Sequence, residues 1–293
     1  TDAANNSMYT HDVSGTDDTA IENTAYGFLA MDAITTGDSN VAIGHGAGSG
    51  ITTGSSNVAV GNKAMLSGAV TGDDNIAIGE LAANNIIGGA RNVAIGTKAL
   101  FTENNHGKNT AVGHESLQTL RAGVDGYNVA VGYNAGKSVT TGTNNTLVGG
   151  TAGDALTTGI SNTALGDTAL GVSITGSYNT AVGRLAIGSG ATTGSYNTAL
   201  GYYSGRLLTS GGSNILLGGY AGSSITIGQN NVAVGMQALS TSVDGDHNTA
   251  VGYQALQDYE DGDGNGHNTA IGSQSQLNAT TGEFNTSLGS LSM

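Results

Sequence analysis

The chain of 293 residues is rich in glycine and poor in charge, with 50 Gly, 10% charged residues and a formal net charge of −14. This balance argues against nucleic acid as a partner, because phosphate contacts need clustered Lys and Arg, and the eight basic residues are scattered. Cysteine is absent, which excludes disulfides and thiol chemistry. No apolar run is long enough to insert directly into a membrane.

Residues 1–20 carry no repeated pattern, and we expect them to form an N-terminal cap or a junction. Residues 21–293 are predicted to form one repeat domain, because a five-residue phrase recurs along them with no shift in composition. The phrase opens with Asn and closes with Gly. Its sixteen copies begin at Asn23, Asn40, Asn57, Asn75, Asn92, Asn109, Asn128, Asn145, Asn162, Asn179, Asn197, Asn214, Asn231, Asn248, Asn268 and Asn285.

Most copies follow one another at the same step, as from Asn23 to Asn40, and at four places the step is longer by one to three positions. Such a short, nearly fixed period is typical of a solenoid, in which each repeat buries its apolar side chains by stacking on its neighbours. The second position is Thr, Val or Ile, and the fourth is Val, Ile or Leu in every copy but the first. This alternation predicts a β-strand. Because the third position is Ala in thirteen copies, we expect the strand to be buried on both faces.

The first and last residues of the phrase are expected to be structural. The asparagines should form an inward ladder of amides bonded from rung to rung, rather than a binding array. The glycines should have a positive φ or leave no room for a Cβ next to the following rung. Representative positions are Asn92, Gly96, Asn128, Gly132, Asn179, Gly183, Asn248 and Gly252.

The part of each repeat after the glycine is predicted to form a second, shorter strand, as in Lys98-Ala99-Leu100. A turn such as Thr35-Thr36-Gly37 then closes the coil. Two strands and two turns fit in a repeat of this length, whereas a helix of useful length does not. The predicted fold is therefore an all-β parallel solenoid of about sixteen rungs.

Five tyrosines gather in one section of the chain and are candidates for receptor binding. Aromatic faces beside polar groups suit the recognition of sugars or proteins. The alternative is simple stacking that protects the edge of the solenoid. The candidates are Tyr178 and Tyr196, which should lie one over the other, and Tyr202, Tyr203 and Tyr220.

The longest insertion contains a candidate calcium site at Asp261, Asp263 and Asn265. Oxygen ligands at alternate positions with intervening glycines resemble the first half of a calcium loop, although Gly272 stands where the closing glutamate would be. The alternative is a solvated acidic turn.

One repeat earlier, Asp244 and Asp246 could complete the oxygen ligands of such a site if the turns stack. His247 over His267 offers a transition-metal alternative. Calcium is the one candidate cofactor.

The phrases Asn40-Val-Ala-Ile-Gly44 and Asn75-Ile-Ala-Ile-Gly79 resemble the head repeats of trimeric autotransporter adhesins, the YadA-like family. The segment Asn248-Thr-Ala-Val-Gly-Tyr-Gln-Ala-Leu256 is similar to repeats of phage tail-fibre proteins. The resemblance covers residues from about 21 to 293 and implies a left-handed β-roll, three chains side by side, on a virion or at a cell surface.

Self-association as a homotrimer is also expected from burial, because two apolar strand faces need covering and one thin coil has a single interior. No Ser, His and Asp recur in a nucleophile arrangement, so we expect a protein that is not an enzyme. The leading expectation is a fibrous phage tail fibre or similar virion appendage that attaches to a host or surface receptor, which could be a glycan. The alternatives are the head of a bacterial adhesin and, less favoured, an exported matrix protein or an exported ice-binding protein that uses the nine threonines of the second position.

Overall fold

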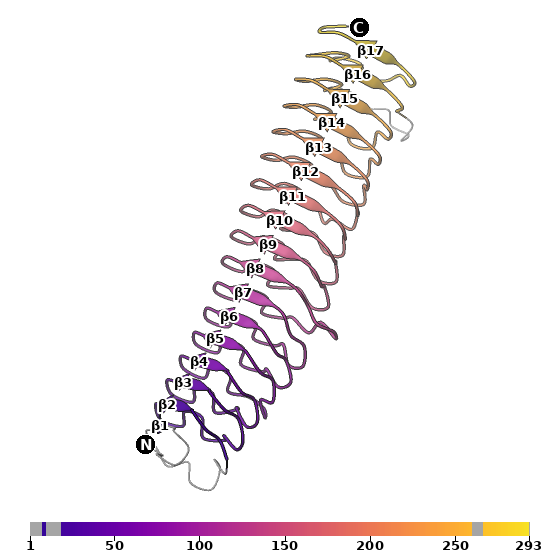
Figure 1. Cartoon of the computed structure of the whole chain (residues 1–293). Coiled ribbons are helices and arrows are strands. Elements are labelled where there is room, and N and C mark those ends of the chain that lie inside the picture. The colour runs from indigo at the N-terminus through magenta and orange to yellow at the C-terminus, as the bar shows by residue number, and fades with distance from the viewer. Residues whose placement is uncertain (1–7, 10–18, 260–265, 293) are drawn as a thin grey trace. The chain divides into compact units, whose positions relative to one another are not determined.

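The computed structural model describes residues 8–9, 19–259 and 266–292, and it is an all-β parallel solenoid with one short strand per repeat (Figure 1). The described residues contain no helix, and thus none that could span a membrane. The predicted solenoid and its regular spacing of rungs along the sequence are confirmed. The chain divides into two units, residues 1–145 and 146–293.

Among its described residues, the first unit contains eight strands that pair in parallel, each with the next along the chain. The register places each repeat position opposite itself, as with Ala42 opposite Ala59. The first strand precedes the repeats and pairs Met8 with Thr24. The strands are β1 (Met8–Tyr9), β2 (Thr24–Tyr26), β3 (Val41–Ile43), β4 (Val58–Val60), β5 (Ile76–Ile78), β6 (Val93–Ile95), β7 (Thr110–Val112) and β8 (Val129–Val131).

In the second unit, residues 146–259 and 266–292 contain nine strands with the same pairing and register, as with Ala164 opposite Ala181. Each strand again covers the second to fourth positions of the phrase. The strands are β9 (Thr146–Val148), β10 (Thr163–Leu165), β11 (Thr180–Val182), β12 (Thr198–Leu200), β13 (Ile215–Leu217), β14 (Val232–Val234), β15 (Thr249–Val251), β16 (Thr269–Ile271) and β17 (Thr286–Leu288).

The core of each rung is built on the third position of the strand, which is buried in β2 to β17. Small side chains are needed there because the coil is narrow. A methyl group added at Gly48 would lie 3.1 Å from Cβ of Ala42 and 3.0 Å from Cδ1 of Ile51, which closes the rung from the opposite side. Ala42 and Ile51 are both fully buried.

The second and fourth positions of the strands point out of this core. In β2 to β17 none of them is buried in the single chain, and Leu165 and Leu200 are 49% and 48% exposed. The prediction of a strand buried on both faces is therefore wrong for one chain. Successive side chains of a strand alternate between its two faces, and so short a coil encloses only one of them.

The predicted second strand is also wrong. In the segment after each glycine, backbone N–H groups donate in turn to the rung before and to the rung after, instead of to one neighbouring strand. Lys98 and Leu100 have left-handed φ values of 55° and 51°. The Lys98 N–H donates to the Glu80 carbonyl in the rung before, at 2.9 Å, and the Leu100 N–H donates to the Ser116 carbonyl in the rung after, at 2.9 Å. The arc thus joins three successive rungs without strand geometry.

The glycine that ends each strand behaves as predicted. Gly96, Gly132, Gly183 and Gly252 have φ values of 131°, 141°, 125° and 136°, which L residues rarely adopt. A Cβ on Gly183 would lie 2.7 Å from the carbonyl oxygen of Gly201 in the next rung. Glycine is required both by the positive φ and by the short distance to the backbone of the next rung.

Candidate binding surface

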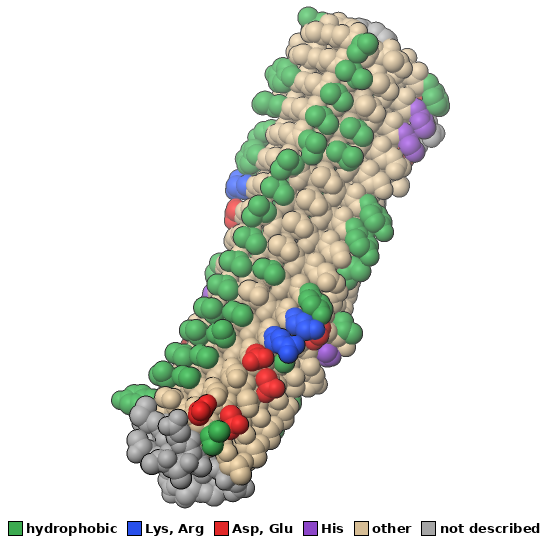
Figure 2. All heavy atoms as spheres, in the orientation of Figure 1, with side chains coloured by type: hydrophobic (Ala, Val, Ile, Leu, Met, Phe, Trp, Pro, Cys, Tyr) green, Lys and Arg blue, Asp and Glu red, His purple; other side chains and the backbone are tan. Residues whose placement is uncertain are grey.

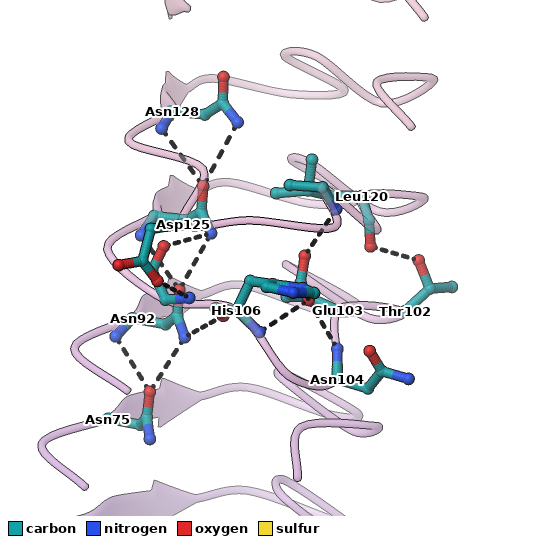
Figure 3. A network of polar contacts seen from close by, with 12 residues as sticks. Asn75, Asn92, Thr102, Glu103, Asn104, His106, Leu120, Asp125 and Asn128 are labelled. Carbon is teal, nitrogen blue, oxygen red and sulfur yellow. Dashed lines mark hydrogen bonds and ion pairs between the residues drawn. The ribbon is translucent and has the colours of Figure 1, made fainter. Parts of the chain in front are cut away.

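The asparagine column forms the predicted buried ladder, as Figure 3 shows for the first unit. Asn92 is 1% exposed, and its Oδ1 accepts the backbone N–H of Asn109 at 3.0 Å. Its Nδ2 donates to Oδ1 of Asn75 and to the carbonyl of His106, both at 3.2 Å. The side-chain amide therefore ties its own rung to the neighbouring rungs and closes the next turn.

The other asparagines singled out from the sequence make the same bonds. Asn128 donates its backbone N–H to Oδ1 of Asn109 at 3.2 Å. In the second unit, Oδ1 of Asn179 accepts the backbone N–H of Asn197 at 2.9 Å, and Oδ1 of Asn248 that of Asn268 at 3.1 Å. An array of ligand-binding amides is excluded at these positions, because the amides are buried and occupied.

Glu103 is a buried carboxylate that the sequence interpretation missed (Figure 3). Its Oε1 accepts the backbone N–H groups of Asn104 at 2.9 Å and His106 at 3.2 Å, and its Oε2 accepts that of Ala122 at 3.2 Å. The His106 Nδ1 lies 3.3 Å from Oε1. Because backbone N–H groups of two turns donate to this carboxylate, it stabilises those turns.

The sequence contains a signal for this network. Glu103 lies eleven residues after Asn92, and the same repeat position holds a buried aliphatic residue in other rungs, such as Ile51 and Ile86. A carboxylate at a core position must find donors inside the fold. A comparison by repeat position would therefore have found it.

Tyr178 and Tyr196 form the predicted one-rung stack. Their ring centroids are 5.0 Å apart, the planes differ by 7°, and the side chains are 46% and 64% exposed. Both residues directly precede a ladder asparagine and have left-handed φ values of 58° and 63°. The stack leaves one broad aromatic edge in solvent, and its role stays a prediction.

Tyr202, Tyr203 and Tyr220 form a separate cluster. The Tyr202 and Tyr203 centroids are 4.0 Å apart, and both rings contact Tyr220 in edge-on geometry at 5.4 Å. Cζ of Arg206 lies 5.2 Å from the Tyr203 ring centroid. The structure thus divides the five predicted tyrosines into a plain stack and a cluster with a cation.

Two tyrosines of this cluster have pKa values shifted in opposite directions. A hydrogen bond with the Tyr202 hydroxyl, followed by one with the Arg184 guanidinium, lowers the pKa of Tyr203 from its ordinary value. The same hydrogen bond raises the pKa of Tyr202.

The outward strand positions form a second exposed surface in each unit. Every residue at the second and fourth positions is Thr, Val, Ile or Leu, apart from Tyr26. Figure 2 shows hydrophobic side chains in rows that follow the stacked rungs. The exposed ones among them are Tyr26, Ile43, Ile76, Ile78 and Val131 in the first unit and Leu165, Leu200, Ile215, Ile271 and Leu288 in the second.

The candidate calcium ligands Asp261, Asp263 and Asn265 lie outside the described residues, so the calcium site stays a prediction. Of the two carboxylates proposed to complete it, Asp246 has a structural bond. Its Oδ1 accepts the backbone N–H of Gln229 at 2.6 Å, toward the preceding rung.

His247 stacks on His267, as expected from their columns, with centroids 4.6 Å apart, and His267 stacks in turn on Phe284 at 4.9 Å. Within residues 8–9, 19–259 and 266–292, no group of three or more His, Cys, Asp or Glu side chains is placed to hold a metal ion. The histidine pair is thus part of an aromatic column in the described structure.

Comparisons of the sequence with protein-family models and with curated proteins find no match. The function must therefore be argued from the two exposed features, the uncharged strand face and the aromatic edge.

Proposed function

We propose that the chain is a non-enzymatic fibrous protein that assembles as a homotrimer and attaches a particle to a host surface. Its leading setting is a phage tail fibre or similar virion appendage, and the head of a bacterial surface adhesin is the alternative. The observation that carries the proposal is the outward strand face, an uninterrupted series of uncharged, largely aliphatic side chains in each unit.

The strand face has the properties of a surface that is covered in the assembled protein. None of its side chains is buried within one chain, and none is charged. Burial of such a surface against other chains incurs no desolvation of ions and removes apolar area from water. Three parallel solenoids around one axis cover three such faces with closed symmetry.

The ice-binding alternative gains support from the same face. Threonines occupy the second position in four successive strands, at Thr146, Thr163, Thr180 and Thr198, and none of them is buried. Regularly spaced hydroxyl and methyl groups on a flat sheet could order water. The Val, Ile and Leu residues that share this face favour contact with protein instead.

Sedimentation equilibrium of the purified chain tests the assembly. A species of three times the chain mass at micromolar concentration is expected, whereas a stable, folded monomer contradicts the trimer. Thermal hysteresis measured on the same sample should be absent, and a clear hysteresis with faceted ice crystals would favour the ice-binding alternative.

Attachment is tested with fluorescently labelled chain on bacterial cells and on animal and plant tissue from the environment of the source organism. Binding to a bacterial envelope supports the virion appendage, and binding to tissue supports the adhesin head. Binding to none of these surfaces contradicts an attachment function.

A further inference from the structure

The basic residues of the second unit are concentrated at one place. Residues 146–293 contain nine acidic residues but only two basic ones, Arg184 and Arg206. Both contact Tyr203. Cζ of Arg206 lies 5.2 Å from its ring centroid, and the Tyr203 backbone N–H donates to the Arg184 carbonyl at 3.2 Å. Because the rest of the unit carries no Lys or Arg, an anionic ligand that binds through such a side chain must bind at these two arginines.

The two arginines have different partners. Nε of Arg184 lies 3.2 Å from Oδ2 of Asp167, which fixes one edge of that guanidinium. Arg206 makes no ion pair within the described residues, and its positive charge is compensated only by the ring of Tyr203. A planar guanidinium offers paired N–H donors that match the two oxygens of a carboxylate.

Beside these charges lies an open aromatic shelf. Tyr202 and Tyr220 are 41% and 37% exposed, and their rings meet edge-on at 5.4 Å. In the rung that carries Tyr220, the repeat position corresponding to Tyr202 is Gly219. A Cβ added at Gly219 would meet only the Tyr202 carbonyl oxygen, 4.0 Å away, so the surface at Gly219, one rung after Tyr202, is open.

The plain stack of Tyr178 and Tyr196 shows what distinguishes this cluster. Among the described residues, no cation lies over the rings of that pair, whereas the cluster of Tyr202, Tyr203 and Tyr220 has the Arg206 guanidinium over one ring and Arg184 bonded to Tyr203 through the backbone. Aromatic rings stack on the apolar faces of sugar rings, and arginine binds carboxylates.

From this arrangement we propose that Tyr202, Tyr203, Tyr220, Arg184 and Arg206 form a binding site for an acidic glycan, a sugar ring that carries a carboxylate. The ring packs in the space beside Gly219 against Tyr202, and the carboxylate is bound by Arg206. The inference rests on the proposed attachment function, for which it names the class of receptor.

The test uses the full chain and two carboxylated probes from different sources. Trigalacturonate represents uronic acids and is compared with its methyl ester, and 3′-sialyllactose represents sialic acids and is compared with lactose. Calorimetry should detect binding of at least one acidic probe and much weaker binding of its neutral counterpart. The affinity should fall as salt is raised, because exposed charges are screened.

Four variants locate the site. Arg206→Gln should weaken binding about tenfold or more, the effect of losing a charge-assisted bond, and Gly219→Met should abolish it by filling the space beside Tyr202. The matched controls are Arg91→Gln, at an arginine in the first unit, and Ser273→Met, at the same repeat position as Gly219 but remote in sequence. Both controls should bind normally.

Equal binding of the acidic and neutral probes, binding of neither acidic probe, or full binding by Arg206→Gln would each overturn the proposal. Circular dichroism of Gly219→Met checks that the solenoid is intact. The labelled-cell assay separates the two claims. Cells that bind wild type and Arg206→Gln equally leave attachment standing and refute this site, whereas a chain that binds trigalacturonate but no cell refutes attachment alone.

Discussion

The glycine at the end of each strand is a residue whose replacement should be costly. Gly183→Val places a β-branched side chain at a φ of 125° and against the Gly201 carbonyl, so we expect a loss on the order of several kcal/mol. Gly219→Ala is the control, because its Cβ enters open space, and it should change stability by less than about 0.5 kcal/mol. Thermal unfolding followed by circular dichroism compares them, and equal melting temperatures would contradict this role of Gly183.

The ladder asparagine should tolerate neither loss of its donor nor a negative charge. Nδ2 of Asn214 donates to Oδ1 of Asn197 at 3.0 Å and to the Gly228 carbonyl at 2.8 Å. Asn214→Asp turns these contacts into repulsions, so the melting temperature should fall at neutral pH and partly recover at acidic pH, where a protonated carboxyl can donate again. The exposed control Asn144→Asp should show neither effect, and a pH-independent Asn214→Asp variant would count against the ladder.

Between rungs, side-chain ion pairs add a pH-dependent contribution. Nζ of Lys137 lies 2.7 Å from Oε2 of Glu115, one rung earlier, and this contact lowers the pKa of Glu115 below its ordinary 4.5. A lowered folded-state pKa stabilises the fold above the unfolded pKa, and the contribution disappears as the pH falls through the folded value. The melting-temperature difference between wild type and Glu115→Gln should therefore shrink on acidification below about pH 4.5.

The control for this pair is Glu80→Gln, at an exposed glutamate with no ion pair within the described residues. Its difference from wild type should stay small at every pH. A Glu115→Gln difference that does not change with pH would show that the contact with Lys137 contributes nothing measurable, as for many exposed pairs.

The regular strand and its two flanking residues were predictable from sequence because they depend on local periodicity. The asparagine and glycine represented by Asn92 and Gly96 recur in every copy of the phrase. The asparagine amide can both donate and accept hydrogen bonds, and glycine has no Cβ, so both roles could be predicted. The arc after the glycine was not predictable in the same way. Its left-handed positions are occupied by residues such as Lys98 and Leu100, which carry no sequence signal for that conformation.

The candidate site was predictable only in part. The gathering of tyrosines in one section of the chain gave Tyr202 and Tyr203, but the contact of Arg206 with the Tyr203 ring depends on how the side chains are oriented. Repeat spacing alone places Arg184 and Tyr202 at the same position of successive rungs. It does not say whether their side chains meet.

For the whole molecule, the strand face should control assembly without controlling the fold. The double variant Leu165→Lys, Leu200→Lys puts charges at two outward positions that are about half exposed, so we expect a monomer with an unchanged circular dichroism spectrum. Tyr178→Lys, at a side chain 46% exposed, is the control and should remain trimeric. Sedimentation equilibrium gives the masses. A double variant that is still trimeric would show that the interface is not on the strand face.

The hydrogen bonds described above join each rung only to its immediate neighbours. Within each unit, the number of rungs can therefore change without altering the contacts of the remaining rungs. Removing one whole repeat takes out one layer of about 4.8 Å and lets identical positions meet across the cut. The length of each unit is therefore set by its number of rungs. The distance between two features on different rungs of one unit can be changed in steps of one rung, while the residues of each feature stay the same.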